Sequence, residues 1–120
     1  MQADVIKSDE SKEYYFKEGC HILELSNDPD DPEVSIARAK VNPGQSTYWH
    51  VLKDTCERYV ILQGQGIVYV GEHLEQTVAV GDVVRIPAGV RQKIKNTGDG
   101  DLIFLAICSP RFLVANYQQD

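Results

Sequence analysis

The stretch "TYWHVLKDTCERYVILQGQG", residues 47 to 66, decides the fold prediction for this chain. It places His50 and Glu57 on either side of a polar turn, and it closes with Gly64 and Gly66 after a run of Tyr, Val, Ile and Leu. Short runs of β-branched and aromatic residues that end at glycine are typical of β-strands. The stretch therefore predicts β-strands that carry two polar side chains, His50 and Glu57, of the kinds that can bind a metal ion or act as acid and base.

The remainder of the chain has the same character. Short runs rich in Val, Ile, Tyr or Phe, bounded by Gly, Pro, Asn or Asp, predict strands. No segment keeps a 3.6-residue apolar period for long, so helices are not expected beyond a turn near residues 8–19. The predicted strands cover 20–25, 34–41, 57–64, 66–71, 76–80, 82–87, 91–96 and 102–108. This number and spacing of strands predict an all-β barrel or sandwich in one domain.

The net charge of -6 is unevenly distributed. Residues 1–33 carry ten acidic and three basic residues, whereas the remainder carries eight acidic and nine basic residues. We therefore divide the single domain into an acidic N-terminal arm with the first strand (1–33), a barrel (34–110) and a C-terminal tail (111–120). Nucleic acid is not an expected partner, because phosphate binding requires clustered positive charge.

The composition, 42% hydrophobic and 25% charged, is that of an ordinary globular protein. No apolar run reaches the roughly 18 residues of a membrane span, and the acidic N-terminus lacks the features of a secretory signal. These observations predict a cytoplasmic protein with no membrane partner. Cys20, Cys56 and Cys108 are odd in number and scattered, which predicts free thiols.

Alternation along the strands separates inward from outward side chains. In 91–96 the three basic side chains share one face, which is expected to be solvated, so Gln92 points inward. If Glu57 points inward, Tyr59 does so too. The side chains expected to line an internal pocket are Tyr48, Leu52, Ile61, Ile94 and Phe104.

Two segments carry a family resemblance. The pattern G-x5-H-x-H-x(3,4)-E-x6-G matches at Gly44, His50, Leu52, Glu57 and Gly64, with leucine at the second histidine. The pattern G-x5-P-x-G-x2-H-x3-N matches at Gly81, Pro87, Gly89, Gln92 and Asn96, with glutamine at the histidine. With these spacings the chain resembles the cupin superfamily over residues 34–110. The resemblance implies a single-domain cupin, a double-stranded β-helix or jelly-roll-like barrel.

Within that superfamily the chain is most similar to the single-domain cupins described as mannose-6-phosphate isomerase-like, including the closing "CSPRF" at 108–112. The resemblance implies a divalent-metal site in the barrel, held by His50, Glu57 and Gln92. Imidazole, carboxylate and amide oxygen are ligands for zinc, nickel, iron or manganese. Because Leu52 and Gln92 replace two histidines, such a site would bind its metal weakly or not at all.

The residues leave the function of this pocket open. With a metal it would suit an isomerase, lyase or oxygenase acting on a small sugar-like or carboxylic substrate. Without a metal, His50, Glu57 and Tyr59 could act as acid and base, as in the epimerase cupins that use a histidine and a tyrosine. The alternatives are a binding or sensor barrel without catalytic activity, and a structural partner of an assembly that uses the acidic arm.

A homodimer is expected from the final strand. The segment 102–108 is apolar on both faces, and open strand edges favour association. The predicted partners are therefore a small-molecule ligand and a second copy of the chain.

Overall fold

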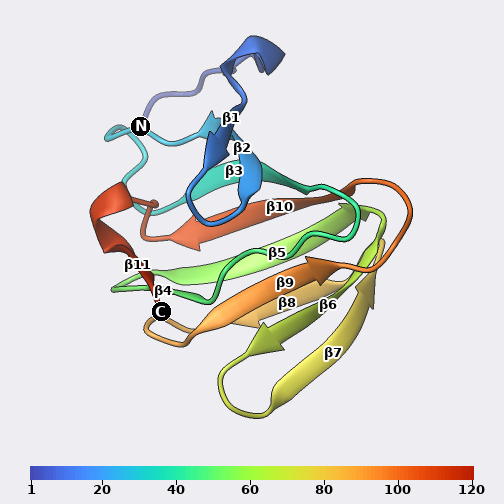
Figure 1. The fold of residues 1–120 in the computed structure, drawn as a ribbon. Helices are drawn as coiled ribbons and strands as arrows, with labels where there is room; N and C mark the ends of the chain where they lie inside the picture. The colour runs from blue at the N-terminus through green and yellow to red at the C-terminus, as the bar shows by residue number, and fades with distance from the viewer.

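The computed structural model describes residues 1–120 and consists of two antiparallel sheets that lie face to face (Figure 1). The six-stranded sheet has the order β1 (Tyr14–Phe16), β2 (Cys20–Ser26), β3 (Ser35–Val41), β10 (Leu102–Ser109), β5 (Cys56–Gln63) and β8 (Val83–Ile86). The five-stranded sheet has the order β11 (Tyr117–Gln119), β4 (His50–Leu52), β9 (Gln92–Asn96), β6 (Gln65–Val70) and β7 (Leu74–Ala79). Two single-turn 3-10 helices, η1 (Glu10–Lys12) and η2 (Val114–Asn116), complete the chain.

All eight predicted strands are present, and the all-β jelly-roll prediction is confirmed. The three additional strands β1, β4 and β11 have three residues each. Such segments are too short to show an alternating pattern. They form strands through tertiary pairing, β1 with β2, β4 with β9, and β11 with β4. One of them, β4, begins at His50 and pairs that residue with Gln92 of β9.

The core lies between the two sheets and contains a cluster of fifteen buried residues. Strand β10 is central in its sheet, between β3 and β5. Its residues alternate strictly between buried side chains such as Phe104 and half-buried ones such as Leu105. The second apolar face expected for this strand is therefore the outer surface of the sheet.

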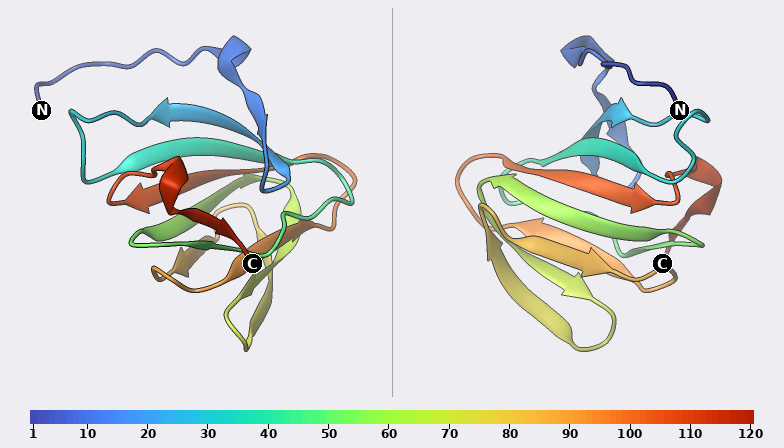
Figure 2. Two further views of the ribbon diagram at one scale, coloured as in Figure 1. Left: turned by 60° about the vertical axis from the view of Figure 1, so that its left-hand side comes forward. Right: turned by 180° about the vertical axis from the view of Figure 1, so that it is seen from behind.

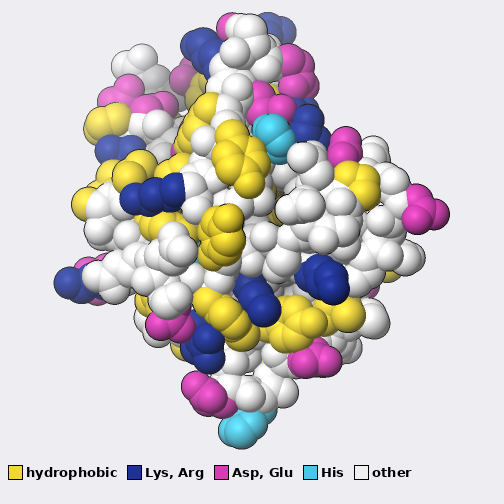
Figure 3. Space-filling view, viewed as in Figure 1, with side chains coloured by type: hydrophobic (Ala, Val, Ile, Leu, Met, Phe, Trp, Pro, Cys, Tyr) yellow, Lys and Arg dark blue, Asp and Glu magenta, His cyan; other side chains and the backbone are white.

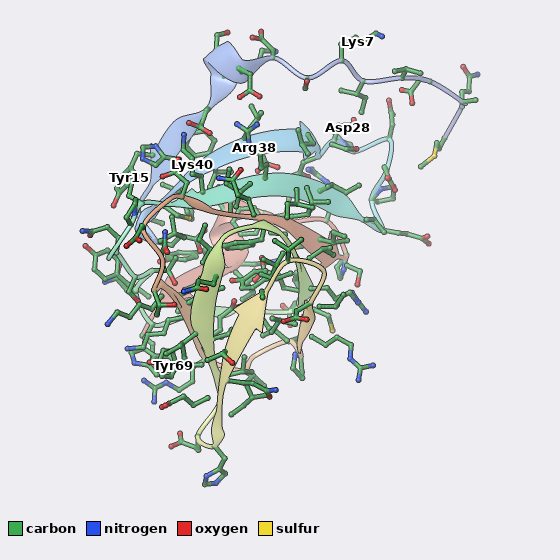
Figure 4. The ribbon with its side chains drawn as sticks, turned by 90° about the vertical axis from the view of Figure 1, so that its right-hand side faces the viewer. Lys7, Tyr15, Asp28, Arg38, Lys40 and Tyr69 are labelled. Atoms are coloured by element: carbon green, nitrogen blue, oxygen red, sulfur yellow. The ribbon has the colours of Figure 1, made fainter.

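The N-terminal arm reaches the barrel through β1 and β2, which form one end of the six-stranded sheet. Before η1 the chain runs extended along the outside, as the left panel of Figure 2 shows. Figure 4 shows Arg38 and Lys40 on β3, beneath this segment. Arg38 bonds both oxygens of Glu10 at 2.7 and 2.6 Å and contacts Glu13 at 2.9 Å, and Lys40 lies 3.1 Å from Glu13. These ion pairs tie the arm to the sheet immediately ahead of β1.

The structure contains no helix long and apolar enough to cross a membrane. All three cysteines are free, as predicted.

Candidate functional site

A small cavity opens between the N-terminal strands and the β5 and β10 strands of the same sheet. Its free volume is about 40 Å³, and eight of its twelve lining residues are hydrophobic. Phe16, Leu52 and Phe112 are among the apolar residues, and Glu18 and Glu57 are among the polar ones. The cavity is therefore a narrow apolar recess with carboxyl groups in its wall.

The structure places the residues expected to line the pocket in different surroundings. Leu52 lies in the cavity wall, but Ile61, Ile94 and Phe104 are packed in the core, each at most 2% exposed. Tyr48 is 53% exposed and does not point into the barrel. The alternation applied to residues 48–52 holds only within a strand, and β4 begins after Tyr48, at His50.

Glu57 is the buried carboxyl of the site, only 8% exposed. Its Oε1 has no hydrogen-bond partner, and its Oε2 lies 3.6 Å from the thiol of Cys108. Burial, followed by the negative charge of Glu18, raises the pKa of Glu57 from 4.5 to about 8, against the opposing effect of its neighbouring hydrogen-bond donors. At neutral pH this group is a carboxylic acid that can donate a proton.

His50 is 1% exposed and both of its ring nitrogens have partners. Nδ1 lies 2.7 Å from the carbonyl oxygen of Tyr48, which can only accept, so Nδ1 carries a hydrogen and donates it. Nε2 lies 3.1 Å from Oε2 of Glu18. A hydrogen bond at this position requires one proton between imidazole and carboxylate, because two lone pairs would otherwise face each other. The two side chains therefore form a hydrogen-bonded pair that shares one proton, and Glu18 of this pair lies in the cavity wall.

Glu18 was missed in the sequence analysis. It lies in the turn between β1 and β2, outside both signature segments, and no spacing connects it to His50. Glu18 is one of ten acidic residues in the segment 1–33, and nothing in the sequence distinguishes it from those that are exposed to solvent. Only the pairing of the N-terminal strands with the barrel brings it to the site.

Local backbone contacts explain how Glu18 is positioned. The backbone N–H of Tyr48 donates to the Glu18 carbonyl at 2.8 Å, while the Tyr48 carbonyl accepts from His50. Gly19 has φ of +100°, and a Cβ there would lie 3.2 Å from the Ser46 carbonyl oxygen. Glycine is needed for this conformation and close approach. The backbone of Tyr48 thus contacts both members of the pair, Glu18 through its N–H and His50 through its carbonyl.

The buried thiols of Cys20 and Cys108 each contact one of the carboxyl groups, Glu18 and Glu57 respectively. Cys20 Sγ lies 3.2 Å from Oε1 of Glu18, and Cys108 faces Glu57 as described above. Burial is the main cause that raises the pKa of both thiols well above the ordinary value, and the adjacent carboxyl groups add to it. They act here as protonated hydrogen-bond donors rather than as nucleophiles.

Gln92 and Tyr59 form a second polar pair behind the site. The Tyr59 hydroxyl donates to Gln92 Oε1 at 2.5 Å, and Gln92 Nε2 has no partner although Gln92 is fully buried. Burial, followed by the charges of Glu57 and Glu18, raises the pKa of Tyr59 well above 10. Both residues point inward, as predicted, but neither lines the cavity.

The residues expected to bind a metal do not present a matching donor set in this arrangement. The amide oxygen of Gln92 accepts from Tyr59, and Nε2 of His50 faces Glu18. No group of three or more His, Cys, Asp or Glu side chains is placed to hold a metal ion. The geometry favours hydrogen bonding within the protein, and we derive no step through a metal.

The last residue of the second signature has a structural role. Asn96 is fully buried, donates to the carbonyls of Val41 and Gly100 at 2.9 and 2.8 Å, and accepts from the Gly98 N–H at 2.9 Å. Asn96 therefore provides hydrogen-bond partners for backbone groups of the loop before β10, and it does not line the cavity.

Comparison with known proteins identifies relatives of this chain. An oxalate-binding protein of Thermotoga maritima is 37% identical over 72 residues, which are 60% of this chain and 59% of that relative, less than two thirds of its length. An uncharacterized protein of Methanocaldococcus jannaschii is 32% identical over 106 residues, which are 87% of this chain and 84% of the relative.

The fold is also shared with solved structures. A conserved protein of Klebsiella pneumoniae with a double-stranded beta-helix domain superposes with a TM-score of 0.77 at 15% identity, covering 98% of this chain and 97% of the other. The family described as "Cupin domain" matches residues 37–108, which is more than half of the chain. This chain belongs to the cupin family.

Proposed function

We propose that this chain is a small-molecule-binding cupin whose pocket acts through protein groups that hold protons, and that it does not require a bound metal. The observation that carries the proposal is the 3.1 Å contact between Glu18 Oε2 and His50 Nε2. This contact occupies the imidazole nitrogen that a metal would need. The unpartnered Oε1 of Glu57 supports the proposal, because it leaves a buried polar atom for a ligand to satisfy.

The reaction class that suits these groups is proton transfer. The Glu18–His50 pair can give up or take the proton that it shares, and Glu57 can donate the proton that it keeps at neutral pH. Two proton-holding groups beside one cavity suit an isomerisation, or an elimination of the lyase type. In this proposal His50 and Glu57 keep the catalytic roles expected from the sequence. Tyr59 instead supports Gln92, to which it donates its hydroxyl hydrogen.

The metal-dependent alternative rests on His50 and Glu57, which stand at two ligand positions of the first signature. Elemental analysis decides between the two. The protein is purified without chelator or metal affinity, incubated with manganese, iron, nickel or zinc, and compared with Glu57→Ala. We expect no stoichiometric metal in either. Near-stoichiometric metal in the parent that is lost in the variant contradicts the proposal.

A second experiment tests the proton-holding pair directly. Nitrogen NMR of labelled histidine reports which ring nitrogen of His50 carries hydrogen. We expect Nδ1 to be protonated, and we expect Glu18→Gln to change the Nε2 signal while Glu33→Gln, on an exposed residue, leaves it unchanged. An Nε2 signal that is insensitive to Glu18→Gln would refute the proposed pair.

A further inference from the structure

The ionisable groups in the cavity wall are strongly biased toward acids. The twelve lining residues include the carboxyl side chains of Glu18, Glu24 and Glu57, and they include no lysine, arginine or histidine. Glu18 lies in the turn between β1 and β2 and Glu24 lies on β2, so both precede the segment 37–108 that matches the family. The acidic wall is thus largely contributed by a part of this chain outside the shared barrel.

Three basic groups close to the cavity wall, Lys17, Arg111 and His50, are held by contacts with other residues. Lys17 Nζ lies over the rings of Phe16 and Tyr117, 5.9 and 5.1 Å from their centroids. Arg111 donates to Asn27 at 2.9 Å. Burial raises the pKa of Glu24 and the charge of Arg111 opposes this rise, but Arg111 does not line the cavity. His50 is paired with Glu18, so any positive charge on the imidazole is already matched by a carboxylate.

The other basic side chains lie on outer surfaces. Arg38 and Lys40 pair with the arm, on the outer face of β3 (Figure 4). Arg91 and Lys93 contact the Trp49 ring, with the Arg91 guanidinium 3.7 Å and Lys93 Nζ 4.9 Å from its centroid. Figure 3 shows basic and hydrophobic side chains side by side on one outer face of the molecule. None of these cations is among the residues that line the cavity.

A buried anion needs a cation or several hydrogen-bond donors to offset the loss of water. The residues that line this cavity include no cation, and any ionised carboxyl group in its wall repels a bound anion. An uncharged amide or hydroxyl group meets no such penalty, because carboxyl groups accept and donate hydrogen bonds with neutral partners.

Resting on the proposed binding function, we infer that the pocket selects small uncharged hydrogen-bonding ligands and rejects dicarboxylates. The free volume of about 40 Å³ admits only a few heavy atoms, or one end of a larger molecule; sites for drug-sized ligands are typically about 300–1,000 Å³. This specificity differs from that in the name of the Thermotoga maritima relative, an oxalate-binding protein.

Three probes of nearly the same shape test the inference. Oxamide is neutral, oxamate carries one negative charge and oxalate carries two. Each is titrated at neutral pH, in the presence of EDTA, into the labelled full-length protein, and binding is followed by amide NMR at residues of the cavity wall. We expect affinity to fall with each negative charge, so that oxalate binds at least about tenfold more weakly than oxamide.

A charge-reversal pair supplies the control. Glu24 lies at the exposed part of the cavity wall, opposite Ala37 on the neighbouring strand, so Glu24→Lys places a cation there without displacing a large side chain. Glu72→Lys makes the same change in net charge at the exposed turn between β6 and β7. We expect oxalate to gain affinity relative to oxamide in Glu24→Lys and not in Glu72→Lys.

The outcomes separate this inference from the proposed function. Oxalate binding as tightly as oxamide under EDTA overturns the charge selectivity but leaves a metal-free binding pocket. Oxalate binding that appears only after manganese or zinc is added overturns the proposed function. If none of the three probes perturbs the cavity, both are overturned. An equal response of the two lysine variants would show that net charge, not the cavity wall, sets the preference, and so also overturns the inference.

Discussion

Glu18 and His50 lie on different structural elements, a turn between two N-terminal strands and the start of β4, yet Oε2 of one is 3.1 Å from Nε2 of the other. The same carboxylate raises the pKa of Glu57, after burial the largest cause of that shift. The acidic arm therefore contributes directly to the pocket. The two signature segments describe only part of this site.

Removing the charge of Glu18 should change the titration of Glu57. Because the Glu18 carboxylate raises the pKa of Glu57, we expect Glu18→Gln to lower that pKa from about 8 toward the ordinary range. Carbon NMR of labelled glutamate carboxyls measures the titration directly. Glu33→Gln, which removes an exposed carboxylate, should leave it unchanged. An unaltered Glu57 titration in Glu18→Gln would show that burial alone causes the shift.

Glu57 should make the fold less stable as the pH rises. Its pKa is raised from 4.5 to about 8 in the folded state, so between these values the unfolded chain has released a proton that the folded chain retains. The free energy of unfolding therefore falls across this range, by an amount on the order of a few kcal/mol. We expect Glu57→Gln to be more stable than the parent at pH 8.

The measurement is urea unfolding at several pH values between 4 and 8. Below pH 4.5 the parent carboxyl is protonated in both states, so the advantage of Glu57→Gln should disappear there. A difference between variant and parent that does not change with pH would mean that Glu57 titrates normally.

Gly19 should be essential for placing Glu18. Its φ of +100° is strained for other residues, and a Cβ would lie 3.2 Å from the Ser46 carbonyl oxygen. We expect Gly19→Ala to cost about 1–3 kcal/mol of unfolding free energy, and to alter the Nε2 signal of His50 as Glu18→Gln does. Gly100→Ala is the matched control, because Gly100 has no positive φ and a Cβ there meets nothing within 4 Å. Equal effects of both substitutions would contradict the positioning role.

A homodimer is expected from the outer face of β10. Ile103, Leu105 and Ile107 are half-buried on this face, in the middle of the six-stranded sheet. A second copy would cover them and remove apolar area from water. We predict a mass near twice 13.5 kDa by light scattering and a monomer for Leu105→Glu. A parent that is strictly monomeric at micromolar concentration would refute the dimer.

The sequence predicts most of the barrel and part of the site for a common reason: both depend on alternation within long strands. Glu57 and Tyr59 are buried together on β5, and Gln92 is buried on β9, as their parity requires. The same rule misplaced Tyr48, which precedes a strand of only three residues. Alternation also does not distinguish a cavity wall from a filled core, and Ile61 lies in the core cluster.

The sequence alone is enough to predict an all-β barrel and the inward direction of Glu57 and Gln92, because these depend on local periodicity and on glycines and prolines at turns. The cupin fold and the ligand positions of His50 and Glu57 came instead from the resemblance of the two signature segments. The carboxylate that pairs with His50 is known only from the folded structure. This pairing depends on β1 and β2 pairing with the barrel and on Gly19 passing close to residues 46–48, and contacts between distant segments leave no periodic signal in the chain.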